Sequence, residues 1–193
     1  MPSSHTLHPA RYRVHQFFLA VRAYLPVWAG GFQSGLTHSD ASLVKQALTT
    51  PAQQQLFNRM PPNDQRHALA VARILQQAGH TDSALMQAAL LHDVGKSLGQ
   101  PLFYRVLIVL FEAFWPAALT WLSRDTTRTL AMSKIGWWRR PFVIHAHHPA
   151  LGATWAKSAG CEAEAVRLIA GHEEKANPQD KLLLALQWAD NLN

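Results

Sequence analysis

The stretch "AALLHDVGKSLG" (residues 88–99) places a histidine and an aspartate side by side at the end of an apolar run. The surrounding residues 81–95 have the pattern of a helix, with Thr81 or Asp82 as its N-cap and a stop near Gly95. Two ionisable groups at a buried helix end are costly unless other helices bring partners to them. The fold therefore depends on whether other helices bring ionisable side chains to the same place.

The composition fits a globular protein with anionic partners. The 193 residues are 48% hydrophobic and 16% charged, and the formal net charge is +6. This charge favours phosphorylated small molecules, nucleic acid or an acidic membrane surface. The single cysteine, Cys161, excludes an internal disulfide and fits a reducing compartment. We find no clear secretory signal, so the expected location is the cytoplasm, and the basic N-terminal arm leaves membrane association open.

The pattern predicts an all-α fold, because no segment alternates apolar and polar residues for long enough to form a sheet. Short linkers favour a single-domain helical bundle. The expected helices cover residues 38–48 with Ser39 or Asp40 as cap, 49–60 with Thr50 as cap, 61–79 ended by Gly79, 81–95, 148–160, 161–174 and 177–193.

Residues 102–122 are long and apolar enough to span a bilayer. Arg105, Glu112 and Pro116 argue against a span, because a charge at mid-membrane costs roughly 2.5–3.5 kcal/mol on insertion scales. We expect one helix that is buried against the domain on one face, followed by a basic, tryptophan-bearing loop near the mouth of the site. The alternative is a hydrophobic helix that contacts a membrane or a partner.

Five of the expected helices each carry an ionisable residue on the stripe that faces the core. A single residue of this kind is more often a hydrogen-bonded core side chain than a ligand. Four imidazoles and two carboxylates together are costly to bury unless they are paired or bound to metal. Such donors suit one or two divalent ions, among iron, manganese, zinc, nickel, cobalt and magnesium, with positions left for water and substrate. The residues are His67, His92, Asp93, His148, His172 and Asp190.

The same residues, in this order, resemble the HD superfamily of metal-dependent phosphohydrolases. The resemblance runs from His67 to Asp190 and rests on "HDVGK" (92–96), "HHPALGA" (147–153), "LIAGHEE" (168–174) and "WADN" (188–191). The two added histidine segments resemble the dinuclear branch, which includes the diadenosine tetraphosphate hydrolases. No Gly-Tyr-Pro follows the "HHP" segment, which disfavours a cyclic dinucleotide phosphodiesterase. The apolar and basic insert at about 101–141 departs from the compact hydrolases and leaves the substrate open.

The resemblance implies a role for each residue. A first ion would be held by His67, His92, Asp93 and Asp190, and Asp93 would bridge to a second ion held by His148 and His172. His145 and His147 compete with His148 for this role, and His148 is preferred because it directly precedes "PALGA". His147 would then face the surface or the substrate.

The catalytic assignment falls on Asp93 and Lys96. Asp93 would orient a metal-activated water that attacks phosphorus, and Lys96 would contact a phosphate oxygen as a point charge. A solvated lysine near a helix end is the alternative for Lys96. Arg139 and Arg140 would hold substrate phosphates from the insert, and Glu173 would orient a histidine or be exposed.

The domain organisation implied is an N-terminal helical extension over residues 1–60 and an HD phosphohydrolase domain over 61–193. Three functions remain: a phosphohydrolase for a nucleotide-like substrate, a catalytically weak HD domain that binds nucleotides or signals, and a membrane-surface protein with a structural metal. The complete ligand set favours the first. No specific nucleic acid binding is expected, because the basic residues form no recognised reading helix. The oligomeric state is not indicated.

Overall fold

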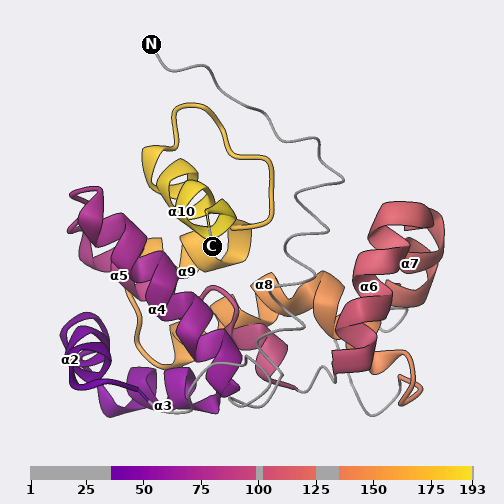
Figure 1. Ribbon diagram of the computed structural model, residues 1–193, viewed down its shortest axis with the longest axis horizontal. Helices are drawn as coiled ribbons and strands as arrows, with labels where there is room; N and C mark the ends of the chain where they lie inside the picture. Colours follow the sequence, from indigo (N-terminus) through magenta and orange to yellow (C-terminus); the bar gives the residue numbers. More distant parts are fainter. Residues whose placement is uncertain (1–35, 99–101, 125–134, 193) are drawn as a thin grey trace, which may run out of the picture. The chain divides into compact units, whose positions relative to one another are not determined.

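The computed structural model describes residues 36–98, 102–124 and 135–192, and these residues form helices and no strands (Figure 1). The prediction of an all-α protein is therefore confirmed for the described chain. The described residues form two compact units. We call them the histidine unit, residues 36–98 with 144–192, and the aromatic unit, residues 102–124 with 135–143.

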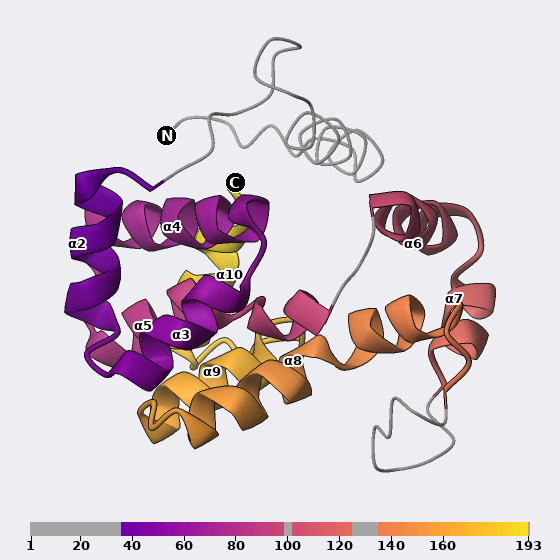
Figure 2. The same ribbon diagram turned by 90° about the horizontal axis from the view of Figure 1, so that it is seen from below.

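The histidine unit is built around one short helix, α5 (Ser83–Leu91), whose residues from Ala84 to Leu91 are all buried. A helix that is apolar on every side must be enclosed by others. Neighbours of α5 in Figures 1 and 2 are α2 (His38–Ala47), α3 (Pro51–Arg59), α4 (Pro62–Gln77), α9 (Ala163–Gly171) and α10 (Lys181–Asn191). The chain leaves α5 through a short 3₁₀ helix, η2 (Val94–Leu98).

The helix ends follow local sequence signals. Thr50 caps α3 in a capping box with Gln53, as predicted. The N-cap of α2 is Thr37, so the prediction of Ser39 or Asp40 was wrong by two or three residues. Asp40 instead occupies the third helical position and completes the capping box, because its carboxylate reaches back to the Thr37 backbone N–H.

Helices α2 and α3 lie in the segment interpreted as an N-terminal extension, and both contribute to the core of the histidine unit. Leu43 and Val44 of α2 and Leu56 and Phe57 of α3 belong to the same buried cluster as Leu85 of α5. The part of the chain that packs around α5 thus begins well before residue 61.

Helix α8 (Arg140–Ser158) begins eight residues earlier than expected and contains Pro149 in its interior. The sequence pattern placed the start at His148, within the segment "HPALGATWAKSAG". An interior proline removes one helical hydrogen bond, so one backbone carbonyl oxygen in the preceding turn is left without its donor. Gly160, at φ 76°, ends the turn before α9.

In the aromatic unit, two helices replace the single one predicted over 102–122. Helix α6 (Leu102–Phe114) and helix α7 (Pro116–Ser123) are separated by Trp115, which has φ −148° and ψ 63°. Pro116 explains the break, because a proline disfavours helical angles in the preceding residue and cannot donate to the previous turn.

A small cluster joins the two helices. Ile108 of α6, Leu122 of α7 and Phe142 are buried together. No single helix in the described ranges is long and apolar enough to cross a bilayer; the pair Ser83–Leu98 and Phe103–Phe114 reaches that length and hydropathy only when its parts are taken together.

Candidate metal centre

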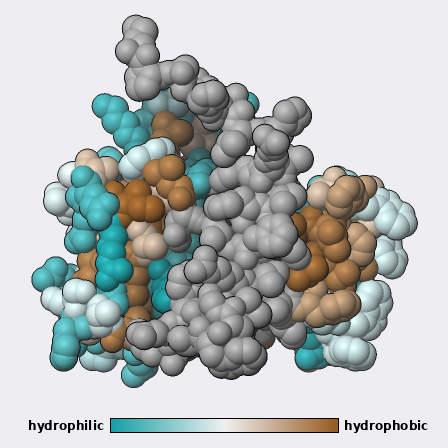
Figure 3. Space-filling model, in the orientation of Figure 1, coloured by the Kyte–Doolittle hydropathy of each residue, from teal (hydrophilic) through white to brown (hydrophobic). Residues whose placement is uncertain are grey.

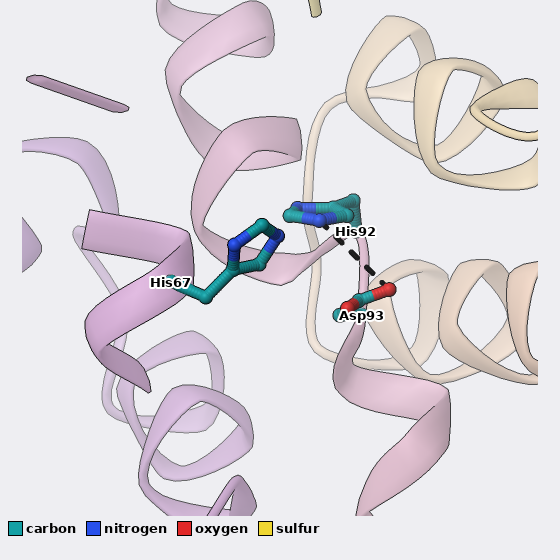
Figure 4. Close-up of side chains that lie close together, drawn as sticks. All are labelled: His67, His92 and Asp93. Atoms are coloured by element: carbon teal, nitrogen blue, oxygen red, sulfur yellow. Dashed lines mark ion pairs between the residues drawn. The ribbon is translucent and has the colours of Figure 1, made fainter. Parts of the chain in front are cut away.

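The centre begins where α5 ends. His92 is the C-cap of α5, and Asp93 follows it in the turn before η2. Both side chains are buried, and they lie beside His67 of α4, whose ring points toward that of His92 (Figure 4). The ring centroids of His67 and His92 are 5.2 Å apart. A fully buried helix therefore delivers two ionisable groups to the interior.

Three histidines share one local arrangement. Nδ1 of each lies within hydrogen-bond distance of the carbonyl oxygen three residues earlier: 3.0 Å from Ala89 for His92, 2.6 Å from His145 for His148, and 2.8 Å from Ile169 for His172. A carbonyl oxygen only accepts, so each Nδ1 carries the proton. In the neutral rings, Nε2 is therefore left as a lone pair.

Each of these carbonyl groups is free for a local reason. Ala89 and Ile169 stand in the last turns of α5 and α9, where carbonyl oxygens lack helical donors. The His145 carbonyl in mid-helix would normally accept from the residue four positions later, but that residue is Pro149, which has no N–H. The proline thus releases the carbonyl that orients His148.

The Nε2 atoms and the carboxylates converge on one place. His67, His92 and Asp93 offer ligand atoms that all lie within 4.8 Å of one another, and so do Asp93, His148 and His172. Asp93 Oδ1 is 3.8 Å from His92 Nε2, 3.4 Å from His148 Nε2 and 3.6 Å from His172 Nε2. Asp93 is therefore common to both groups.

Asp190 approaches the first group from α10. Its Oδ1 is 2.8 Å from His67 Nε2 and 3.6 Å from His92 Nε2. The side chains of His67 and Asp190 are 29% and 34% exposed, whereas that of His148 is fully buried. The structure thus brings together all six residues predicted as ligands, and the side formed by α4 and α10 is open to solvent.

Within the described part of the chain, the Nε2 lone pairs of His92, His148 and His172 face no hydrogen-bond donor. Nε2 of His148 and Nε2 of His172 are 3.3 Å apart, and two neutral rings with protons on Nδ1 would present lone pairs to each other. Among the described residues, His92 Nε2 has no partner in hydrogen-bond geometry, and Asp93 Oδ1 meets one cation, the Lys96 ammonium at 2.8 Å, while it faces three histidine Nε2 atoms. Buried acceptors of this kind are costly unless a cation lies among them. Imidazole nitrogen and carboxylate oxygen are donors that divalent transition metals accept, so the set could hold a metal ion.

The pKa values of the ion-free protein reflect the same demand for positive charge. Burial alone would raise the pKa of Asp93, but the charges of Lys96 and His92 hold it well below its usual value. Burial lowers the pKa of His67 and of His92, and the neighbouring Asp93 and Asp190 outweigh it, so both pKa values are raised. A proton is the smallest cation that the cluster attracts.

The pKa of His148 is shifted in the opposite direction. Burial, followed by the charge of Lys96, lowers its pKa, so its ring is held in the neutral form that ligates metals. The C-terminal ends of α5 and α9 point their partial negative charge at the same place through His92 and His172. The first effect leaves the His148 ring available to a metal ion, and the second favours any cation at this place.

Lys96 and Glu173 flank the ligands. The Lys96 ammonium is 2.8 Å from Asp93 Oδ1 and 2.9 Å from Oδ2. It balances the charge of Asp93 but contributes no donor to the histidines. Glu173 is nearly half exposed, and its Oε1 is 3.4 Å from His148 Nε2. Both side chains stand between the buried ligands and solvent.

A glycine contact fixes the distance between α8 and η2. A Cβ atom on Gly95 would lie 2.1 Å from the carbonyl oxygen of His148 and 2.9 Å from its Cα. Opposite, a Cβ on Gly152 would lie 3.3 Å from Val94 Cγ1 and 3.4 Å from the Gly95 nitrogen. The two small residues let the backbones touch, which brings His148 within reach of Asp93.

The other predicted substrate contacts are not in this cluster. Arg139 donates from Nε to the Leu122 carbonyl and from a terminal nitrogen to that of Arg124, and Arg140 donates to Ile135. Both arginines thus contact backbone of the aromatic unit. His147 is partly buried beside His148, and most of the predicted basic loop lies outside the described residues.

Sequence reasoning overlooked the residues that position the ligands. Gly95 was predicted only as the stop of a helix, and neither Pro149 nor Gln187 was given a role. Gln187 donates to the carbonyl oxygens of His172 and Glu174, which ties the end of α9 to α10. Cys161 has no part in the centre, and burial raises the pKa of its thiol to about 11.

The comparisons with known proteins give no relative. No family model, curated protein or solved structure matches this chain.

Proposed function

We propose that the protein is a metal-dependent phosphohydrolase of the HD type that cleaves a phosphoester or phosphoanhydride bond in a nucleotide-like substrate. The observation that carries the proposal is the convergence of four imidazoles and two carboxylates, in which the Nε2 lone pairs of His92, His148 and His172 meet no donor from the described residues. The ordered resemblance of these residues to the HD superfamily supports the hydrolytic interpretation.

The residues divide between two ions in the proposal. His67, His92, Asp93 and Asp190 would hold the first, and Asp93, His148 and His172 would hold the second. When bound, divalent ions of this kind polarise phosphoryl oxygens and make water a good nucleophile near neutral pH. Seven donor positions, with Asp93 counted twice, exceed a closed tetrahedral site, which argues against a purely structural metal.

Substrate access supports catalysis over a structural role. The open side is bordered by His67, Asp190, Lys96 and Glu173, which are all partly exposed. Lys96 presents an ammonium there, and an ammonium pairs well with a phosphate oxygen. Its contact with Asp93 keeps the charge in place until an anionic substrate arrives.

The test is a metal measurement followed by an activity screen. Freshly purified protein would be analysed for bound metal, then assayed for phosphate release from nucleotides with iron, manganese, zinc, nickel, cobalt or magnesium added. His172→Ala is the site variant, and His38→Ala, in the exposed first turn of α2, is the matched control.

We expect bound metal and metal-dependent turnover in the parent and in His38→Ala, and in His172→Ala a loss of the second ion and of turnover. Metal binding without turnover of any nucleotide would instead support the alternative of a nucleotide-binding or signalling module. Absence of metal affinity in the folded parent protein would refute the proposal.

A further inference from the structure

The net positive charge of the chain lies outside the histidine unit. The described residues of the aromatic unit, 102–124 and 135–143, contain four basic residues and one acidic residue, a net charge of +3. The histidine unit contains nine basic and ten acidic residues, a net charge of −1. The attraction to anionic partners inferred from the whole composition therefore does not come from the histidine unit.

The same unit exposes large apolar side chains. On α6, Phe103, Leu110 and Phe114 are separated by seven and four residues, so they lie along one line of the helix surface. Phe114 is 83% exposed, and Trp115 after it is 64% exposed. Further exposed tryptophans are Trp121, Trp137 and Trp138. We call Phe103, Leu110, Phe114 and the adjoining Trp115 the aromatic face.

Helix α6 has two apolar sides, and one of them packs against the start of α8. Tyr104 and Phe111 pack on Phe142, at ring-centroid distances of 5.5 Å and 6.0 Å. That contact covers one side of the helix and leaves the line of Phe103 and Phe114 uncovered within the ranges that the structure describes. Figure 3 shows the apolar surface over α6 and α7.

A groove continues the aromatic face between the helices. Its volume is about 390 Å³, and it is lined by Phe111, Trp115, Ala117, Ala118, Trp121 and Leu122. No charged side chain is among these residues. The guanidinium of Arg139 lies 5.8 Å from the Trp121 ring centroid, and Arg124 is exposed at the end of α7. Arginines thus border an apolar surface.

We propose that the aromatic face is a peripheral membrane-binding surface for anionic lipid. Exposed tryptophan and phenylalanine partition into the boundary between headgroups and acyl chains, and neighbouring arginines add attraction to anionic headgroups. This arrangement needs no membrane-spanning helix. The net charge of +3 on the described residues of this unit, against −1 on the histidine unit, matches a negatively charged surface rather than a neutral partner.

A lipid surface fits better than a nucleic acid. Nucleic acid surfaces alternate cations with rings on which bases stack. Here aliphatic and small residues, Leu110, Ala117 and Ala118, are continuous with the rings, and the described arginines lie at the border.

The experiment measures binding of the full chain to vesicles. Vesicles of phosphatidylcholine with 30% phosphatidylglycerol would be compared with pure phosphatidylcholine by flotation and by tryptophan fluorescence. The double variant Phe114→Ser/Trp115→Ser removes two neighbouring exposed rings, and Arg124→Glu reverses one bordering charge. Trp188→Ser is the control, because Trp188 is 46% exposed on α10 of the histidine unit.

We expect the parent and the control to bind anionic vesicles with a blue shift in fluorescence and to bind neutral vesicles weakly. The double variant should bind about tenfold less, or weaker still, because two buried rings are lost from the interface. Arg124→Glu should bind several-fold less. Raising the salt from 0.1 M to 1 M shortens the screening length from about 10 Å to about 3 Å and should also weaken binding.

Several results would overturn the proposal. Absent vesicle binding, or equal binding by the double variant, would show that the face does not contact lipid. A large loss of thermal stability in the double variant would show that the chain covers this face itself. A lower molecular mass in the double variant would identify a second copy as the occupant. Binding of a labelled single-stranded oligonucleotide, lost in the double variant while vesicle binding persists, would identify nucleic acid.

Discussion

Replacing Gly95 by alanine should separate the two groups of ligands. The new Cβ would lie 2.1 Å from the His148 carbonyl oxygen and 2.8 Å from its carbonyl carbon, and both atoms belong to the backbone of α8. A flexible side chain could move aside, but a helix backbone cannot do so alone. Helix α8 and η2 must therefore move apart by roughly 1 Å to restore ordinary van der Waals contact.

This displacement acts directly on the metal ligands. Asp93 lies two residues before Gly95, and His148 is the residue that would be displaced, so the 3.4 Å distance between Asp93 Oδ1 and His148 Nε2 should lengthen. Ligand distances in metal sites are fixed within about 0.2 Å. The variant should thus lose the ion held by Asp93, His148 and His172 while keeping the group around His67.

Overpacking of this kind costs roughly 1–3 kcal/mol, which corresponds to a melting temperature about 2–12 °C lower for a chain of this size. Metal content and thermal melts would be compared across three glycine variants. Gly152→Ala meets contacts at 3.3–3.4 Å and should lose less, and Gly171→Ala, whose nearest neighbour is Leu183 at 3.8 Å, should lose nothing. Equal metal content and stability in Gly95→Ala and Gly171→Ala would refute the reasoning.

Three further predictions concern single side chains. Asp93→Ala should abolish phosphate release. Lys96→Ala should lower kcat/KM by about one to two decades, because one charge-assisted contact contributes roughly 1.5–3 kcal/mol. Steady-state kinetics with metal added would distinguish the two variants. Pro149→Ala supplies an N–H that competes with His148 Nδ1 for the His145 carbonyl, so titration should show roughly tenfold weaker metal binding while the ion-free protein melts no lower. Burial raises the pKa of Asp40, but hydrogen bonds from Thr37 and the charge of Arg73 outweigh this effect and lower that pKa below 3.8. The ionised Asp40 therefore stabilises the folded state above about pH 4, and this contribution is lost as the pH falls through the pKa of the folded state. Urea unfolding between pH 2.5 and 7 should therefore show a weaker acid dependence in Asp40→Asn, and an unchanged dependence would contradict this.

The sequence predicts those features that depend on neighbouring residues alone, such as the inward face of a helix or a break at a proline. Helical periodicity placed His67, His92 and Asp190 on inward faces, and the structure brings them together. Pro116 predicts the break after α6 by the same local chemistry, but the apolar composition of 102–122 was given more weight. Chain-distant contacts leave no such signal. Nothing near Gly95 indicates that the His148 backbone lies against it, and nothing near Arg139 indicates that it binds carbonyl groups of α7.

The enclosure of α5 has a consequence for the order of events during folding. Because this helix is surrounded by α2, α3, α4, α9 and α10, its amide groups meet solvent only when the whole histidine unit opens. His92 and Asp93 are covalently attached to its end, so they acquire their final positions only after chain segments nearly 150 residues apart have docked. Hydrogen exchange in α5 and the capture of metal should then report the same global opening, and a bound ion would slow both together.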